Sequence, residues 1–291
     1  MELLALVLRL VILGSIFATS LALGLHGSVE DITFIFRRPA KLLKSLLALN
    51  VLVPLVAILL VLWLRPAFIV SLAILLMTVA PVPPFLPGGQ LKLGGRAPYV
   101  YGLLMASALL SIGIVPLSVE TVGRIFGRQA GVSPWAVAQT VLLTVLIPVI
   151  VGVLIRRVAP AFAERLTPGL AKGAGIVLLI GLIPLLIKML PGAVALIGNG
   201  NVLLIAVVTV AALGIGHLLG GPDPDDRTSL ALACGSRHPG VALAIANANF
   251  ADQQAGGAIV LFIIVSAIAS IPYKKWRARH LSMPAASARP A

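Results

Sequence analysis

The sequence predicts an all-α membrane protein with nine transmembrane helices, and two observations support this prediction. Of the 291 residues, 59% are hydrophobic and only 11% are charged, whereas a soluble domain has about 25% charged residues. Several apolar runs also approach the roughly 20 residues that a membrane-spanning helix needs. No segment is long and polar enough to form a separate soluble domain.

The predicted spans cover residues 3–25, 42–63, 66–94, 97–119, 134–155, 170–190, 200–220, 229–250 and 255–273. We expect residues 1–275 to form a single transmembrane domain, with a first repeat over about 1–130 and a second over about 131–275. Residues 276–291 are expected to form a basic, disordered cytoplasmic tail. An alternative interpretation of the first span is a cleaved signal peptide, because Arg9 precedes an apolar run. That run is long for the apolar core of a signal peptide.

The distribution of positive charge predicts the orientation of the chain. With nine spans, 16 of the 22 Lys and Arg residues fall on one side of the membrane and five on the other. The positive-inside rule then places the N-terminus outside and the C-terminus in the cytoplasm, as in a bacterial inner-membrane protein. The net charge of +13 therefore reflects membrane topology and not nucleic-acid binding.

The third predicted span is interrupted. It contains four prolines within seven residues, followed by two glycines: Pro81, Pro83, Pro84, Pro87, Gly88 and Gly89. Each proline removes a backbone donor and crowds the preceding turn, so a helix cannot continue through them. We expect an extended joint over residues 80–88. The alternative is an ordinary loop after a short span that ends near Val79.

The eighth predicted span is interrupted as well, between two apolar flanks. Gly235, Pro239 and Gly240 should divide it into two half-helices, with Arg237 and His238 at the joint. A charged residue at the centre of a membrane costs about 2.5–3.5 kcal/mol on insertion scales, and such a residue marks a functional site by default. Ser236 and the single cysteine, Cys234, lie at the same joint and are candidates to line a pocket. The alternative for Cys234 is a small buried apolar residue.

Two interrupted spans in corresponding halves of a chain point to the binding site of a transporter built from inverted repeats. The residues themselves show no convincing identity between the two halves. The repeat is therefore predicted from the pattern of interruptions alone.

Several short segments resemble the bile acid:sodium symporter family in order and spacing. They are Leu21–Leu25 with the following Phe36–Pro39, Leu47–Pro54, Ala80-Pro81, Gly95-Arg96, Ala231–Gly240 and Ala244–Phe250. The resemblance implies a fold with a core domain and a panel domain, in which two broken helices cross. It also implies uptake of a small organic anion such as a bile acid, a keto acid or a pantoate-like acid, and a member that lacks the first helix of the family.

The chain departs from this family where the family binds sodium. The first crossover of the family carries Ser-Asn after Pro-Gly-Gly, and its second has the pattern Glu-x-Gly-x-Gln-Asn. In this chain the second crossover, residues 233–238, has the sequence Ala-Cys-Gly-Ser-Arg-His, so an alanine stands in place of the glutamate. Asn50 lies beside the position of a further family glutamine, and Ser107 retains an oxygen on the helix after the first crossover. Because sodium needs several oxygen ligands, we expect no metal site, and the sequence indicates no cofactor.

Arg237 offers a substitute for the lost cation. Its guanidinium could satisfy carbonyls at the ends of the half-helices or bind a substrate carboxylate. A purely structural role in tying the helices together remains an alternative. His238 is the leading candidate for coupling to protons, with a buried histidine bonded to a carbonyl as the alternative. The Asp and Glu residues, Asp226 among them, are interpreted as loop or near-loop residues.

The resemblance implies a secondary transporter of a small organic anion, and the departures at the sodium-ligand positions predict that it works without sodium, with Arg237 in place of the bound cation. The expected partners are this anion and the lipid bilayer, and the oligomeric state stays open. A solute-binding membrane receptor and a carrier with sodium at an unrecognised site are the alternatives. An enzyme is not expected, because the predicted spans contain no paired carboxylates and no metal-ligand set.

Overall fold

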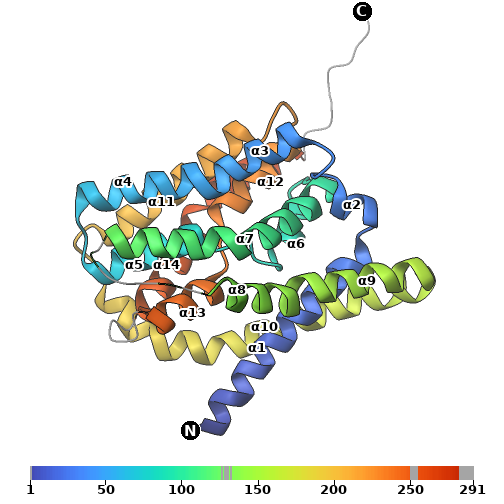
Figure 1. Ribbon diagram of the computed structural model, residues 1–291, viewed down its shortest axis with the longest axis horizontal. Coiled ribbons are helices and arrows are strands. Elements are labelled where there is room, and N and C mark those ends of the chain that lie inside the picture. Colours follow the sequence, from blue (N-terminus) through green and yellow to red (C-terminus); the bar gives the residue numbers. More distant parts are fainter. Residues whose placement is uncertain (1, 126, 128–130, 132, 250–254, 282–291) are drawn as a thin grey trace, which may run out of the picture.

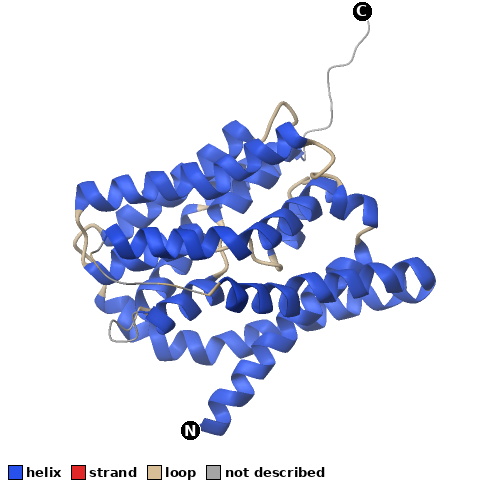
Figure 2. Cartoon of the chain, in the orientation of Figure 1, coloured by secondary structure: helices blue, strands red, loops and turns tan. Residues whose placement is uncertain are grey.

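The computed structural model describes residues 2–125, 127, 131, 133–249 and 255–281. All regular structure in these residues is helical (Figure 2). In chain order the elements are α1 Glu2–His26, α2 Val29–Thr33, α3 Pro39–Leu47, η1 Ala48–Leu52, α4 Val53–Leu64, α5 Phe68–Val79, α6 Leu86–Lys92, α7 Ala97–Ile125, α8 Pro134–Val141, η2 Leu142–Leu146, α9 Ile147–Val158, α10 Pro160–Ala195, α11 Asn201–Leu219, α12 Pro224–Gly235, α13 Pro239–Asn249, α14 Gly256–Ala269 and α15 Ile271–Leu281.

Within the described residues, six helices are long and apolar enough to cross a membrane. They are Pro39–Leu64, Ala97–Arg124, Pro134–Val158, Pro160–Pro184, Asn201–Leu219 and Gly256–Leu281. Three shorter apolar helices, Leu10–His26, Phe68–Val79 and Leu186–Ala195, accompany them. The all-helical membrane architecture agrees with the sequence, while the count of nine spans and the inverted repeat stay predictions.

The helices form two groups (Figure 1). Helices α1, α9 and α10 contact one another on one side of the molecule, and we call them the α1–α9–α10 group. On the other side α11 packs against α4, α12 and α14, and α5 packs against α4, α7 and α14; we call these helices the α11 group. The two groups meet where α10 contacts α14 and where α8, which continues through η2 into α9, contacts α7.

Helix α1 packs very closely against α9 because glycines allow the two backbones to approach. A Cβ atom on Gly152 would lie 2.5 Å from the carbonyl oxygen of Leu21, and a Cβ on Gly24 would overlap the backbone of Val149. The Ser20 hydroxyl donates to the carbonyl of Thr144 at 2.6 Å. Helix α1 thus packs as part of the bundle, while its interpretation as a membrane span stays a prediction.

Two of the long helices contain a turn of π-helix that precedes a proline. In η1 the N–H of Val53 bonds to the carbonyl of Ala48, five residues earlier, and Pro54 follows. In η2 the N–H of Ile147 bonds to the carbonyl of Leu142, and Pro148 follows. Turns of this kind inside α-helices occur frequently at functional sites, and η1 proves to be part of the candidate site below.

The third predicted span is interrupted between Val79, where α5 ends, and Leu86, where α6 begins. The extended joint is shorter than expected, because Pro87, Gly88 and Gly89 lie inside α6 rather than in the joint. Proline is tolerated in the first turn of a helix, where its missing N–H would have no helical partner. Of the four prolines, Pro81, Pro83 and Pro84 therefore lie in the interruption.

The eighth predicted span is interrupted at Ser236–His238. Helix α12 ends at Gly235, Ser236 adopts extended backbone angles, and α13 begins at Pro239 with Gly240 in its first turn. Beyond this span, the segment expected as a disordered tail from residue 276 is helical as far as Leu281, because α15 continues α14 after the single residue Ser270. Residues 282–291 lie outside the described residues.

Candidate substrate site at the two helix breaks

The two interruptions touch each other through their backbones. The N–H of His238 donates to the carbonyl of Pro81 at 2.9 Å, although the two residues belong to opposite halves of the sequence. Residues in an extended joint cannot satisfy their polar groups within a helix, and no water is available in a membrane to do so. Each break thus supplies the other with a hydrogen-bond partner.

Arg237 lies inside this contact and is only 5% exposed. Its Nη2 atom donates to the carbonyl of Leu49 in η1 at 2.6 Å, and its Nη1 donates to the carbonyl of Ala80 at the end of α5 at 3.2 Å. One side chain therefore joins three separate segments: the break after α12, the break after α5 and the π-turn of the second predicted span.

A proline explains why the carbonyl of Leu49 needs a donor. In an α-helix it would accept from the N–H of Val53, but this N–H is already directed at Ala48. The next residue in line, Pro54, has no N–H. The carbonyl of Leu49 is thus left without a partner in its own helix.

The carbonyl of Ala80 is in the same position. In a continuing helix it would accept from Pro84, which also lacks an N–H. Both acceptors of Arg237 are therefore carbonyls that prolines have deprived of helical donors. The planar guanidinium with its five N–H groups can serve both.

The positive charge of Arg237 is not balanced locally. Within the part of the chain that the structure describes, no carboxylate forms an ion pair with Arg237, and its Nε has no hydrogen-bond partner. A buried charge normally needs a counter-charge or a full set of hydrogen bonds. Arg237 therefore has a spare donor and an uncompensated charge next to the helix breaks.

Ser107 of α7 supports the first break from the opposite side. Its Oγ, buried at 5% exposure, accepts a hydrogen bond from the N–H of Val82 at 3.0 Å. Val82 lies between prolines in the extended joint and has no helical partner for this N–H. The hydroxyl of Ser107 thus satisfies a backbone group that the break leaves open.

A cavity of about 450 Å³ opens beside the breaks, between the α1–α9–α10 group and α13. Helix α1 contributes Ile12, Leu13 and Ile16, while Pro81 and His238 contribute from the two breaks. The remaining lining residues come from α8, η2 and α13: Ala136, Val137, Thr140, Val141, Thr144, Gly240, Val241, Ala244, Ile245 and Ala248. The lining is mostly apolar with a few polar groups, which is typical of a small-molecule site.

Among the lining side chains, the ring of His238 is the one with a hydrogen-bond donor to spare. The hydroxyls of Thr140 and Thr144 already donate to the backbone carbonyls of Ala136 and Thr140. The Nδ1 atom of His238 accepts the N–H of Val241 at 3.4 Å, which assigns the ring proton of the neutral form to Nε2. His238 can therefore present one N–H donor to a molecule in the cavity.

The other predicted site residues take different places. Cys234 is 2% exposed in the last turn of α12, belongs to the buried apolar core and does not line this cavity. Ser236 is half-buried at the end of α12, and Asn50 is half-buried in η1. Arg237 itself lies behind the cavity wall, next to His238, and does not line the cavity either.

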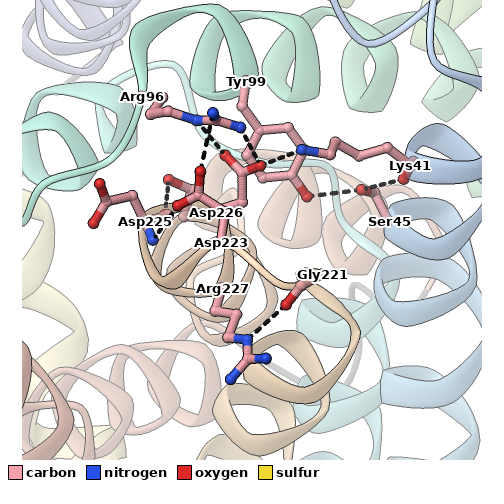
Figure 3. Close-up of polar contacts among 10 residues, drawn as sticks. Lys41, Ser45, Arg96, Tyr99, Gly221, Asp223, Asp225, Asp226 and Arg227 are labelled. Carbon is pink, nitrogen blue, oxygen red and sulfur yellow. Dashed lines mark hydrogen bonds and ion pairs between the residues drawn. The ribbon is translucent and has the colours of Figure 1, made fainter.

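The structure also contains a charge cluster that the sequence did not reveal, at the N-terminal end of α12 (Figure 3). Asp226 is fully buried and pairs with both Lys41 of α3 and Arg96, whose Nη2 lies 2.5 Å from its Oδ2. Arg96 also pairs with Asp223 at 2.9 Å. The hydrogen bond with Asp226, together with the charges of the aspartates, raises the pKa of Arg96. Asp226 thus lies next to a loop, as the sequence indicated, in the first turn of α12, but the sequence did not indicate that it is buried and paired.

Asp226 holds α12 against the segments on either side of the first break. Lys41 lies ahead of that break, on α3, and Arg96 follows it, ahead of α7. One sign of this role was present in the sequence, a run of acidic residues in the first turn of a half-helix, where the helix dipole favours them. The two cations left no such sign, because both approach from more than 100 residues away.

A bundle of apolar helices, with two interruptions in backbone contact beside an apolar cavity, is the architecture of an integral membrane transporter. The chain belongs to the sodium bile acid symporter family, whose family model matches residues 12–196, more than half of the sequence. This is a family of transporters and not of enzymes, and a small-molecule substrate follows from membership. The match includes Leu49 and Ala80 but ends before Arg237. A comparison with curated proteins yields no match.

Proposed function

We propose that the chain is a sodium-independent secondary carrier of a small organic anion, in which the guanidinium of Arg237 replaces the bound cation of related symporters. The observation that carries this proposal is the pair of hydrogen bonds from Arg237 to the carbonyls of Leu49 and Ala80. A bound cation would be attracted to such carbonyls at helix ends. Here a tethered cation binds both.

The residues around the breaks do not fit a sodium ion. Sodium is a hard cation that needs several oxygen ligands, whereas the two carbonyls that prolines leave open are already bound to a positively charged group that would repel it. The methyl group of Ala233, fully buried in α12, stands where the family has a glutamate. Ser107 already accepts a hydrogen bond from Val82. No step of the proposed transport therefore uses sodium.

The proposed substrate is a monoanionic acid with an apolar body. The cavity lining is mostly apolar, and the His238 ring offers it a single donor. The uncompensated charge of Arg237, one residue away, makes this end of the cavity attractive to an anionic group. A multiply charged anion would find too few partners in such a lining, because every charge taken out of water needs compensation.

The proposed motion is a displacement of the α1–α9–α10 group against the α11 group around the cavity. Such movement of one bundle against another gives alternating access in carriers built from repeats. The cavity supports this idea, because it is lined by α1 of the first group and by α13, which packs against α5 and α14 of the α11 group. The nine-span topology, the inverted repeat and the N-outside orientation belong to the same proposal.

The experiment is solute counterflow in proteoliposomes with labelled taurocholate, pantoate and pyruvate, carried out in sodium chloride and in potassium chloride. We expect flux of at least one acid at equal rates in both salts, and loss of that flux in Arg237→Ala. Accumulation driven by a sodium gradient would contradict the proposal. Binding without flux would favour a receptor instead.

A gain-of-function variant extends the test. Ala233→Glu, Arg237→Gln and His238→Asn together restore the family pattern Glu-x-Gly-x-Gln-Asn at the second crossover. If Arg237 occupies the place of the cation, this triple variant should become sodium-stimulated. The single variant Ala233→Glu should not, because Arg237 would then form an ion pair with the new carboxylate.

Coupling to protons is tested separately through His238, since histidine is the residue type in the cavity lining that ordinarily titrates near neutral pH. We expect a pH gradient across the proteoliposome membrane to change the flux of the wild type but not that of His238→Gln. Equal responses of the two proteins would remove His238 from the coupling, and the absence of a response in both would leave the carrier as a facilitator.

A further inference from the structure

The last helix, α15, presents an apolar face that changes into a basic face within a few turns. On the same side of α14 and α15, Ile264, Ile268 and Ile271 are 39%, 60% and 43% exposed. Lys275 and Arg279 follow as exposed residues one and two turns beyond Ile271. The change from apolar to basic residues between Ile268 and Lys275 takes about 10 Å along the helix axis.

Aromatic rings mark the level at which this change occurs. Trp276 is 42% exposed, and its ring lies 5.4 Å from that of His217 and 5.1 Å from that of His280. The hydroxyl of Tyr273 lies 2.9 Å from Nδ1 of His217, which ties α15 to α11. Trp and Tyr are enriched where a membrane meets water. The apolar residues therefore lie at acyl-chain depth and the basic residues at headgroup depth.

Positive charge is concentrated on the part of α15 that follows these aromatic rings. The buried Arg277 pairs with Asp225 at 3.3 Å, so this arginine is part of the protein interior. On the exposed face, Lys275 and Arg279 are four residues apart, so that both side chains lie on the same side of the helix. A single anionic group can therefore contact both side chains.

We infer that the exposed face of α14 and α15 binds an anionic phospholipid. Its phosphate would lie at Lys275 and Arg279 beside Trp276, and its acyl chains along Ile264, Ile268 and Ile271. The vertical order of apolar, aromatic and basic groups matches the order of chains, glycerol and headgroup in a lipid. This order distinguishes the surface from a site for free phosphate, because phosphate has no apolar part that would contact the isoleucines.

The experiment measures which lipids remain bound to the purified protein, by native mass spectrometry from mixed micelles of phosphatidylglycerol and phosphatidylcholine. We expect selective retention of phosphatidylglycerol by the wild type. The double variant Lys275→Gln/Arg279→Gln should weaken its binding about 30-fold, because each basic residue at an anionic surface contributes about fivefold in affinity. Inorganic phosphate at millimolar concentration should not displace the lipid.

The matched control is Arg165→Gln/Lys172→Gln, which removes the same charge from two exposed residues of α10. This control should retain phosphatidylglycerol as the wild type does. An equal loss in both double variants would show general charge attraction and overturn the inference. Equal retention of both lipids by the wild type, or displacement by phosphate, would overturn it as well.

Discussion

Arg237 carries a full charge at 5% exposure, and its energetic role depends on what it satisfies. Burial of a guanidinium is costly, but removal of this one would leave the carbonyls of Leu49 and Ala80 without donors. A buried acceptor without a partner costs about 1–3 kcal/mol. A single substitution at Arg237 mixes these opposing contributions, so that a double-mutant cycle is required to separate them.

The first prediction uses Pro54. In an Arg237→Met background, Pro54→Ala should raise the apparent Tm, because the substituted alanine supplies the N–H that the carbonyl of Leu49 then lacks. In the wild type the same substitution should help less, since Arg237 already serves this carbonyl. The coupling between the two sites, measured by thermal unfolding in detergent, should fall within about 0.5–3 kcal/mol. Pro148→Ala, which follows the other π-turn, is the control and should show no coupling to Arg237.

A second prediction concerns Ser107. Ser107→Ala removes the acceptor of the Val82 N–H and should destabilise the protein by about 1–3 kcal/mol. Ser107→Thr retains the oxygen and should recover most of the loss. Ser111→Ala, four residues further along α7, should have a smaller effect, because the Ser111 hydroxyl donates to the carbonyl of Ala108 within its own helix. Equal losses at both serines would refute the role of Ser107 in the break.

At the scale of elements, the half-helix α12 is fixed at both of its ends by charged side chains. Arg237 follows its C-terminal end and binds the first break, while Asp226 in its first turn binds Lys41 and Arg96. A half-helix of 12 residues has few hydrogen bonds of its own, so that tertiary contacts must position it. The position of Arg237 relative to the first break therefore also depends on the ion pairs of Asp226.

A third prediction follows for Asp226→Asn. The loss of this fully buried carboxylate leaves Lys41 without its partner and Arg96 with Asp223 alone. It should cost about 3 kcal/mol, the lower end of the range for broken buried pairs, because Arg96 keeps one ion pair and is 42% exposed. The measurement is again thermal unfolding. Glu120→Gln breaks an exposed pair with Arg124 on α7 and should change stability by no more than about 0.5 kcal/mol. A similar small effect at Asp226 would show that the cluster does not hold α12.

At the scale of the whole molecule, the cavity between α1, α8 and α13 is the feature on which the proposed transport depends. A fourth prediction is that Ala244→Trp abolishes solute counterflow, because the indole fills a cavity of about 450 Å³ lined by this residue. The apparent Tm should change little, since Ala244 faces the cavity. Ala171→Trp on the exposed side of α10 is the control and should transport normally. Counterflow that survives Ala244→Trp would place the substrate elsewhere.

Local chemistry in the sequence was enough to establish the class of protein and the positions of its interruptions. Prolines and glycines act locally, through missing N–H groups and backbone freedom, so Pro81 and Pro239 indicate breaks without any knowledge of the fold. Apolar runs predict membrane helices for the same local reason. The end of the first break was misjudged because Pro87 fits the first turn of α6.

The partners of these residues were determined by the packing of helices that are distant in the sequence. That Arg237 reaches Leu49 and Ala80, and that Asp226 is buried by Lys41 and Arg96, depends on segments more than 100 residues apart in the chain. The same holds for Cys234, which packing turned into a core residue, and for the cavity beside His238. The physical reason is that an unpaired donor or charge must find a partner, while the identity of that partner is set by which helices the fold brings beside it.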